Sequence, residues 1–61
     1  MPTVIVEMFE GRTVEQKRQL VDGITQSFVK IGTPGEAVHV IMHELSRQNY
    51  STGGKLASDK T

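Results

Sequence analysis

The sequence predicts a small α/β fold, a β-α-β unit with parallel strands followed by a short C-terminal hairpin. Two stretches with strand periodicity flank one stretch with helical periodicity, and no internal repeat divides the chain. A crossover from one strand through a helix to the next is right-handed in about 98% of cases and leaves the two strands parallel. We therefore expect a single domain over residues 1–61.

The first strand is predicted over residues 3–9, where side chains alternate with a period of two. Val4, Val6 and Met8 share one face, and Ile5 lies on the other. Because both faces carry apolar side chains, both faces of the sheet are expected to be covered.

A helix is expected to begin at Val14. Thr13 and Gln16 have the spacing of a capping box, in which each side chain accepts a hydrogen bond from the backbone N–H of the other residue. The helix should extend for about 18 residues and pack one apolar stripe on the sheet. The residues of this stripe are Leu20, Val21, Ile24, Phe28 and Ile31.

The helix should end at residues 32–35, because glycine adopts the left-handed C-terminal conformation and Pro34 cannot continue the turn. A second strand is expected from about Ala37. It alternates Val38, Val40 and Met42 with His39, Ile41 and His43. In the polar tail, we expect a turn at residues 51–54 and a short strand at residues 55–57.

The small size of the chain predicts a homo-oligomer. A domain of about 60 residues buries only about 60% of the surface that its unfolded chain exposes. The sequence has no cysteine, so neither a disulfide nor a thiolate zinc site can supply the missing stability. Association with further copies is the expected remedy, and a second subunit is expected to extend the sheet.

The charge distribution argues against nucleic acid and membrane as partners. Seven basic and seven acidic residues give a net charge of zero, and no basic run is present. No cationic segment precedes a long apolar stretch at the N-terminus, so a cytoplasmic location is expected.

The N-terminus offers a titratable amine. Pro2 follows Met1, which is usually removed before a small second residue, and removal leaves Pro2 with a secondary amine. An α-amino group has a pKa of roughly 7.7–8.0, and burial beside a cation lowers it. Such an amine can act as a general base near neutral pH, although many chains begin with Met-Pro and have no such role.

Several short motifs, taken in order, resemble the 4-oxalocrotonate tautomerase family. They are Pro2 before a short strand, Glu10-Gly11-Arg12, Glu15-Gln16-Lys17 at the start of the helix, Glu44 at the end of the second strand, and Tyr50 before Gly53-Gly54. The resemblance spans nearly the whole chain. It implies the tautomerase fold and an isomerase assembled from identical small subunits, typically a hexamer built as a trimer of dimers.

The resemblance also implies a reaction and a site. Pro2 would be the general base for the keto-enol conversion, by a 1,3- or 1,5-proton shift, of an unsaturated 2-hydroxy or 2-oxo acid such as 2-hydroxymuconate, in aromatic catabolism. Arg12 would hold a substrate carboxylate through two parallel hydrogen bonds. No cofactor is implied. Without the resemblance, Arg12 would be interpreted as a solvated turn residue.

Two further residues are candidates for substrate binding. His39 stands where the bacterial members of the family carry a second arginine, and a histidine near neutral pH is often an uncharged donor instead of a fixed cation. It is either a pocket residue with a weaker electrophilic effect or a residue of an oligomer interface. Tyr50 falls where the family has an aromatic wall beside the proline, and it could equally anchor an interface.

The length of the first strand separates two of these candidates. Seven residues at about 3.3 Å each place Pro2 and Arg12 at the two ends of a strand of roughly 23 Å. An antiparallel strand from a second subunit would bring its Arg12 beside this Pro2. His39 and His43 lie about 13 Å apart along the second strand, too far to share a metal ion within one chain.

Two alternatives remain open on the sequence. A relative could use the same amine for another reaction, such as decarboxylation or hydration, because a neutral amine is also a nucleophile. The chain could instead be a non-catalytic oligomeric interaction module, in which Pro2 has no chemical role.

Overall fold

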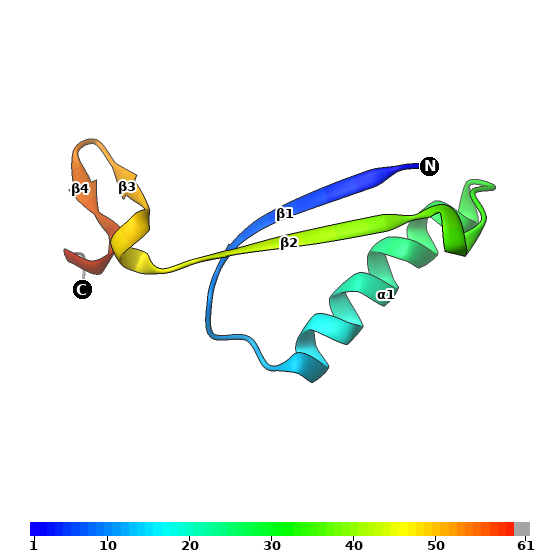
Figure 1. Ribbon diagram of the computed structural model, residues 1–61, viewed down its shortest axis with the longest axis horizontal. Helices are drawn as coiled ribbons and strands as arrows, with labels where there is room; N and C mark the ends of the chain where they lie inside the picture. The colour runs from blue at the N-terminus through cyan, green and yellow to red at the C-terminus, as the bar shows by residue number, and fades with distance from the viewer. Residues whose placement is uncertain (60–61) are drawn as a thin grey trace.

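A computed structural model describes residues 1–59, and it has the predicted order of elements (Figure 1). The helix and strands are β1 (Thr3–Phe9), α1 (Val14–Lys30), β2 (His39–Leu45), β3 (Ser51–Thr52) and β4 (Lys55–Leu56). Short 3₁₀ turns lie at Gly35–Ala37, Arg47–Asn49 and Ala57–Asp59. Residues 60 and 61, the end of the predicted domain, lie outside the described residues.

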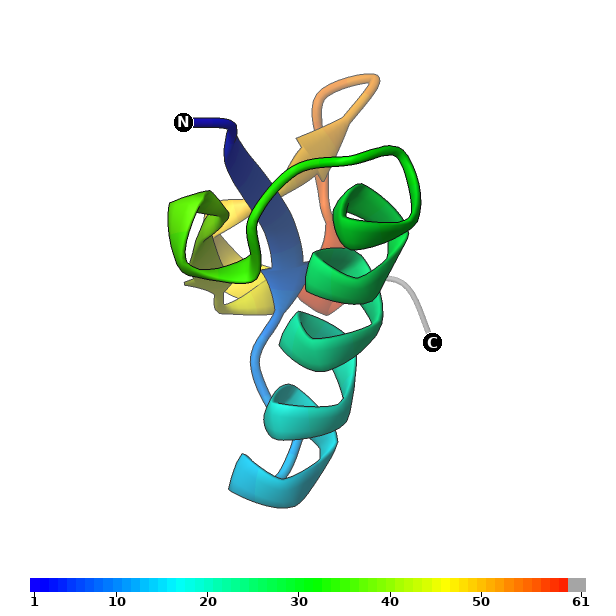
Figure 2. The same ribbon diagram turned by 90° about the vertical axis from the view of Figure 1, so that its right-hand side faces the viewer.

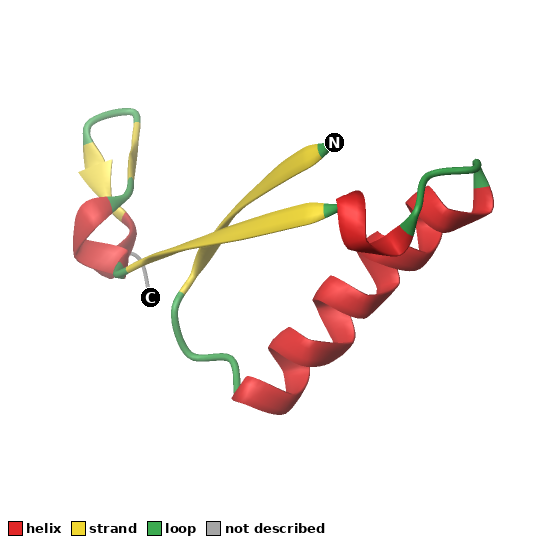
Figure 3. Cartoon of the chain, turned by 45° about the vertical axis from the view of Figure 1, so that its right-hand side comes forward, coloured by secondary structure: helices red, strands yellow, loops and turns green. Residues whose placement is uncertain are grey.

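The strands confirm the predicted α/β fold. β1 and β2 are parallel and in register from Thr3 opposite His39 to Phe9 opposite Leu45. β3 and β4 form an antiparallel hairpin, which lies beyond the end of the two-stranded sheet that is distant from the N-terminus (Figures 1 and 3). The two ends of the sheet therefore present different parts of the chain.

The helix begins at Val14, as predicted, because both hydrogen bonds of the capping box form. The Thr13 hydroxyl accepts from the backbone N–H of Gln16 at 3.1 Å, and the Thr13 N–H donates to Oε1 of Gln16 at 2.9 Å. The helix ends at Lys30, and Gly32 then turns the chain with a φ of 100°. The predicted length was correct to one residue.

The predicted start of the second strand near Ala37 was wrong by two residues. The chain closes a 3₁₀ turn there, with the N–H of Ala37 donating to the carbonyl of Pro34 and that of Val38 to the carbonyl of Gly35. These amides are thus already bonded before the strand begins at His39. Local hydrogen bonding overrode the alternation of apolar residues at this point.

Two details of the tail also differ from the prediction. Ser51–Thr52 is a strand and not part of the turn, because Gly53 and Gly54, with φ of 62° and 83°, are sufficient for a two-residue turn. Ala57 starts a 3₁₀ turn instead of ending the strand, although its N–H still donates to the carbonyl of Tyr50 at 2.8 Å. The short C-terminal hairpin itself is confirmed.

The helix covers one face of the sheet, and residues 1–59 leave the other face open. Figure 2, viewed along the strands, shows α1 to one side of them. The even-numbered apolar residues of both strands face the helix and are half-buried: Val4, Val6, Met8, Val40 and Met42. On the opposite face, Ile5 and Ile41 lie across from each other and are 57% and 45% exposed. The expected cover of this second face does not come from the chain itself.

The dimensions of the chain also indicate an incomplete core. Its radius of gyration is 14.8 Å, whereas a compact domain of this length has about 10.5 Å. Its accessible surface is 4698 Å², whereas about 3,900 Å² is typical of a folded monomer of this size. Among residues 1–59, no side chain is buried. Association with other copies is the physical means by which such a chain can bury its apolar surface.

One ion pair holds the start of the helix to the end of β2. Nζ of Lys17 donates to Oε1 of Glu44 at 2.6 Å, and both side chains are about two-thirds or more buried. Within the described part of the chain, no helix has the length and hydropathy that a membrane span requires.

The incomplete core predicts that stability depends on protein concentration. A hundredfold dilution should lower the free energy of unfolding by about 2.7 kcal/mol for each association step that is lost. Urea unfolding, followed by circular dichroism at several protein concentrations, measures this effect. A midpoint that does not move with concentration would show that the monomer is stable alone.

Candidate active site

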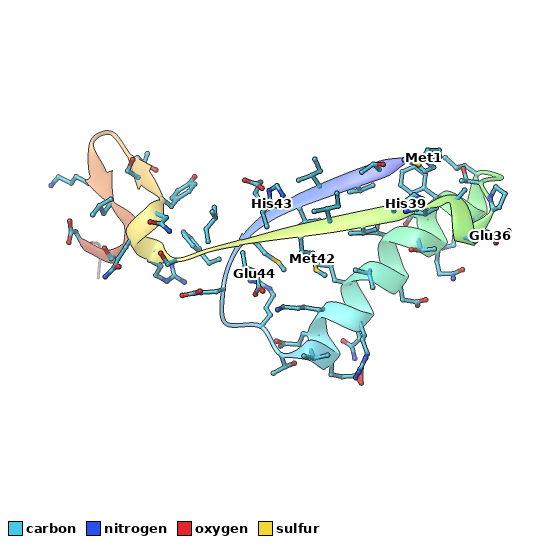
Figure 4. The ribbon with its side chains drawn as sticks, in the orientation of Figure 1. Met1, Glu36, His39, Met42, His43 and Glu44 are labelled. Carbon is cyan, nitrogen blue, oxygen red and sulfur yellow. The ribbon has the colours of Figure 1, made fainter. Side chains whose placement is uncertain are left out.

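Pro2 and His39 lie together at the end of the sheet where both strands begin, and Figure 4 shows His39 at this end, on the same side of the molecule as Met1. The backbone N–H of His39 donates to the carbonyl of Pro2 at 2.9 Å, which fixes Pro2 at the start of the parallel ladder. Pro2 is half-buried, while the preceding Met1 is 82% exposed. The nitrogen of Pro2 is in a peptide bond with Met1 in this chain, so it becomes an amine only when Met1 is removed.

The side chain of His39 belongs to the face of the sheet opposite the helix. Strand alternation places it with Thr3, Ile5 and Ile41, and His39 is itself exposed. Its position beside Pro2 fits a pocket residue, and its place on the open apolar face fits an interface residue. Both roles that the sequence left open for His39 are therefore compatible with its place in the fold.

Arg12 and Tyr50 lie at the opposite end of the sheet, and both are in contact with Phe9. Nη1 of Arg12 donates to the backbone carbonyl of Phe9 at 3.2 Å. The ring of Tyr50 packs against the ring of Phe9 in a T-shaped arrangement, with centroids 5.3 Å apart and an angle of 82° between the planes. Phe9, the last residue of β1, is thus the common support of both candidates.

A hollow of about 210 Å³ opens beside this aromatic pair. Its walls are predominantly apolar and are formed by Glu7, Met8, Phe9, Leu45 and Tyr50. Tyr50 remains 48% exposed, so its ring is accessible from the hollow. An apolar depression with an aromatic wall suits a flat, unsaturated molecule and excludes part of the water around it.

The structure brings the four predicted residues together as two separate pairs. Pro2 and His39 form one pair, Arg12 and Tyr50 form the other, and the seven residues of β1 lie between them. The length of β1 is roughly 23 Å at strand rise. A single small ligand therefore cannot contact both pairs within one chain.

The sequence reasoning missed one cation at the second end. The guanidinium carbon of Arg47 lies 4.2 Å from the centroid of the Phe9 ring, in a cation–π contact. Arg47 precedes Tyr50 by three residues in the 3₁₀ turn that leads to the hairpin. No spacing rule links it to Phe9, since the two residues are far apart in the sequence.

A second histidine pairs with a carboxylate outside the site. Nδ1 of His43 and Oε1 of Glu7 form a hydrogen bond across the two strands, and both side chains are more than half exposed. Such exposed pairs contribute little to stability. Within residues 1–59, no group of three or more potential ligands is placed to hold a metal ion.

Comparisons with known proteins agree with this fold. The model of the family described as "Tautomerase enzyme" matches residues 2–60. A protein of Bacillus cereus named a probable tautomerase is 44% identical over 61 residues, which cover 98% of this chain and 100% of that protein.

Solved structures give the same result. YwhB, described as a homologue of 4-oxalocrotonate tautomerase, superposes with a TM-score of 0.90 at 39% identity, over 98% of this chain and 100% of that one. A fused 4-oxalocrotonate tautomerase, described as an asymmetric trimer, superposes with a TM-score of 0.82 at 41% identity. This alignment covers 90% of the present chain and 46% of the fused one. The resemblance noted in the sequence is confirmed, and the chain belongs to the tautomerase family of isomerases.

Proposed function

We propose that the protein catalyses the keto-enol conversion of an unsaturated 2-hydroxy or 2-oxo acid, such as 2-hydroxymuconate, with the amine of Pro2 as general base. The single observation that supports this most is the separation of two complementary half-sites by the length of β1. One half-site carries the proline, and the other carries a guanidinium beside an apolar hollow.

An antiparallel pairing of β1 with β1 of a second copy would complete the site. β1 pairs with β2 along one edge, and its other edge has no partner strand among the described residues. In a two-fold pairing, the start of each strand lies at the end of the other, so each Pro2 meets the Arg12 and Tyr50 of its partner. Two equivalent sites result from one interface.

The roles of the residues follow from their chemistry. The uncharged amine of Pro2 takes the hydroxyl proton of the enol and returns a proton to a carbon of the conjugated chain. The planar guanidinium of Arg12 binds a carboxylate of the substrate and withdraws electron density from it. Tyr50 excludes water from the amine, which favours its neutral form. His39, beside Pro2, donates a hydrogen bond to the reacting end of the substrate.

The proposed assembly is a hexamer, a trimer of such dimers. The open sheet face with Ile5 and Ile41 supports further association beyond the β1 edge, because two-fold pairing of edges leaves that face uncovered. The pathway proposed is aromatic catabolism.

Replacing the proline tests the role of the amine. Pro2→Ala should reduce kcat for the ketonisation of 2-hydroxymuconate by at least about 100-fold, because general base catalysis contributes on that scale. Absorbance spectroscopy follows the reaction, and intact mass should show that Met1 is absent from the active protein. Retained Met1 in a fully active protein, or an unchanged rate in Pro2→Ala, would contradict the proposal.

Replacing the arginine tests the carboxylate contact. Arg12→Ala should raise KM about tenfold for a diacid such as 2-hydroxymuconate, since one charge-assisted hydrogen-bonded contact is lost. The effect on a monoacid, phenylenolpyruvate, should be much smaller. Steady-state kinetics with both acids measures the difference, and an equal loss for the two would argue against this role of Arg12.

A further inference from the structure

Arg47 is a second cation at the end of the sheet that carries Arg12. Its guanidinium carbon lies over the ring of Phe9, 4.2 Å from the centroid, while Nη1 of Arg12 donates to the carbonyl of the same residue at 3.2 Å. If a phenylalanine measures about 6 Å from its carbonyl oxygen to its ring centre, Nη1 of Arg12 and Cζ of Arg47 are at most roughly 13 Å apart. Both guanidinium groups thus contact Phe9, a residue that lines the apolar hollow.

Neither guanidinium is neutralised by the described part of the chain. The ion pairs formed between residues 1–59 join Lys17 to Glu44 and His43 to Glu7. Arg47 lines a second, more polar hollow of about 590 Å³, and Glu10, the carboxylate residue of that lining, forms no ion pair with it. Two exposed and unpaired cations at one place in a chain of zero net charge are available to an anionic ligand.

The donors of Arg47 are free among the described residues. Its guanidinium carbon lies over the Phe9 ring, and no hydrogen bond or ion pair of its side chain forms within residues 1–59. A guanidinium fork of this kind matches the two oxygens of a carboxylate. The contact with the ring also restricts the side chain before a ligand arrives, so less conformational freedom is lost on binding.

We propose that Arg47 acts with Arg12 to bind the carboxylate that a diacid substrate carries and a monoacid lacks. This inference rests on the proposed function for the position of the substrate, and it assigns Arg47 as a determinant of specificity for dicarboxylates. A carboxylate bridging two guanidinium groups places their carbons about 8 Å apart, which lies within the limit set by Phe9.

Binding of two non-reacting acids tests the proposal independently of catalysis. Muconate and sorbate are both six-carbon dienoic acids. Muconate has two carboxylates, whereas sorbate has one. Isothermal titration calorimetry should show that Arg47→Gln weakens muconate binding about tenfold and changes sorbate binding less than twofold. Arg47→Lys should give an intermediate loss for muconate, because it keeps the charge but not the planar fork.

Two controls make the result specific. Arg18→Gln removes an exposed arginine from α1, outside the site, and should leave both affinities unchanged. In the double variant Arg12→Ala/Arg47→Gln, the loss for muconate should be smaller than the product of the two single losses, because both side chains hold the same carboxylate.

The proposal is overturned if Arg47→Gln leaves muconate affinity unchanged, if it weakens both acids equally, or if the parent protein binds no muconate. The proposed function is tested by a different measurement, the turnover of enol acids by the parent and by Pro2→Ala. If the parent turns over enol acids but Arg47→Gln binds muconate and sorbate as the parent does, only the role of Arg47 is rejected. If Arg47→Gln weakens the binding of muconate alone but the parent turns over no enol acid, only the enzymatic proposal is rejected.

Discussion

The protein depends on one constraint: a single chain of this fold has too few layers to enclose its apolar side chains. The helix covers one face of a two-stranded sheet, and the other face presents Ile5 and Ile41 to solvent. Among residues 1–59, every apolar side chain keeps some exposure. A second copy could supply the missing layer, and folding and association would then be coupled in the free energy of the native state.

The same constraint has a consequence for the site. A strand of seven residues is long enough to keep Pro2 and Arg12 apart, and one edge of β1 has no partner strand within residues 1–59, so a second copy can pair there. The interface that would bury apolar surface would also join the two half-sites. On this account, a substitution that weakens the interface lowers activity and stability together, even where it touches no residue of the site.

Much of the fold could be predicted from the sequence because the local signals agree with one another. The capping box at Thr13 fixed the start of α1 to the residue, and the paired glycines marked the hairpin turn. The start of β2 was misplaced because a 3₁₀ turn after Pro34 satisfies the backbone before the strand begins. Hydrophobic alternation carries no information on such local hydrogen bonding.

The candidate site was predicted less completely. Pro2 became a candidate through its amine, Arg12, His39 and Tyr50 became candidates through the resemblance to the family, and strand geometry predicted the separation of Pro2 from Arg12. Arg47 was missed, because its position on Phe9 is a tertiary contact that exists only when the turn after β2 folds back beside the end of β1. The contact of Tyr50 with Phe9 could not be predicted for the same reason.

Complementation between two impaired variants, assayed with 2-hydroxymuconate well below its KM so that Arg12→Ala retains only about a tenth of the parent rate, tests the shared site most directly. When Pro2→Ala and Arg12→Ala chains are unfolded together and refolded as a mixture, half of the two-fold pairs are hybrid. Each hybrid pair contains one intact site, so about a quarter of the parent activity should return. Activity no greater than the sum of the two separate variants, in a mixture shown by mass spectrometry to contain hybrid pairs, would contradict a site built from two copies.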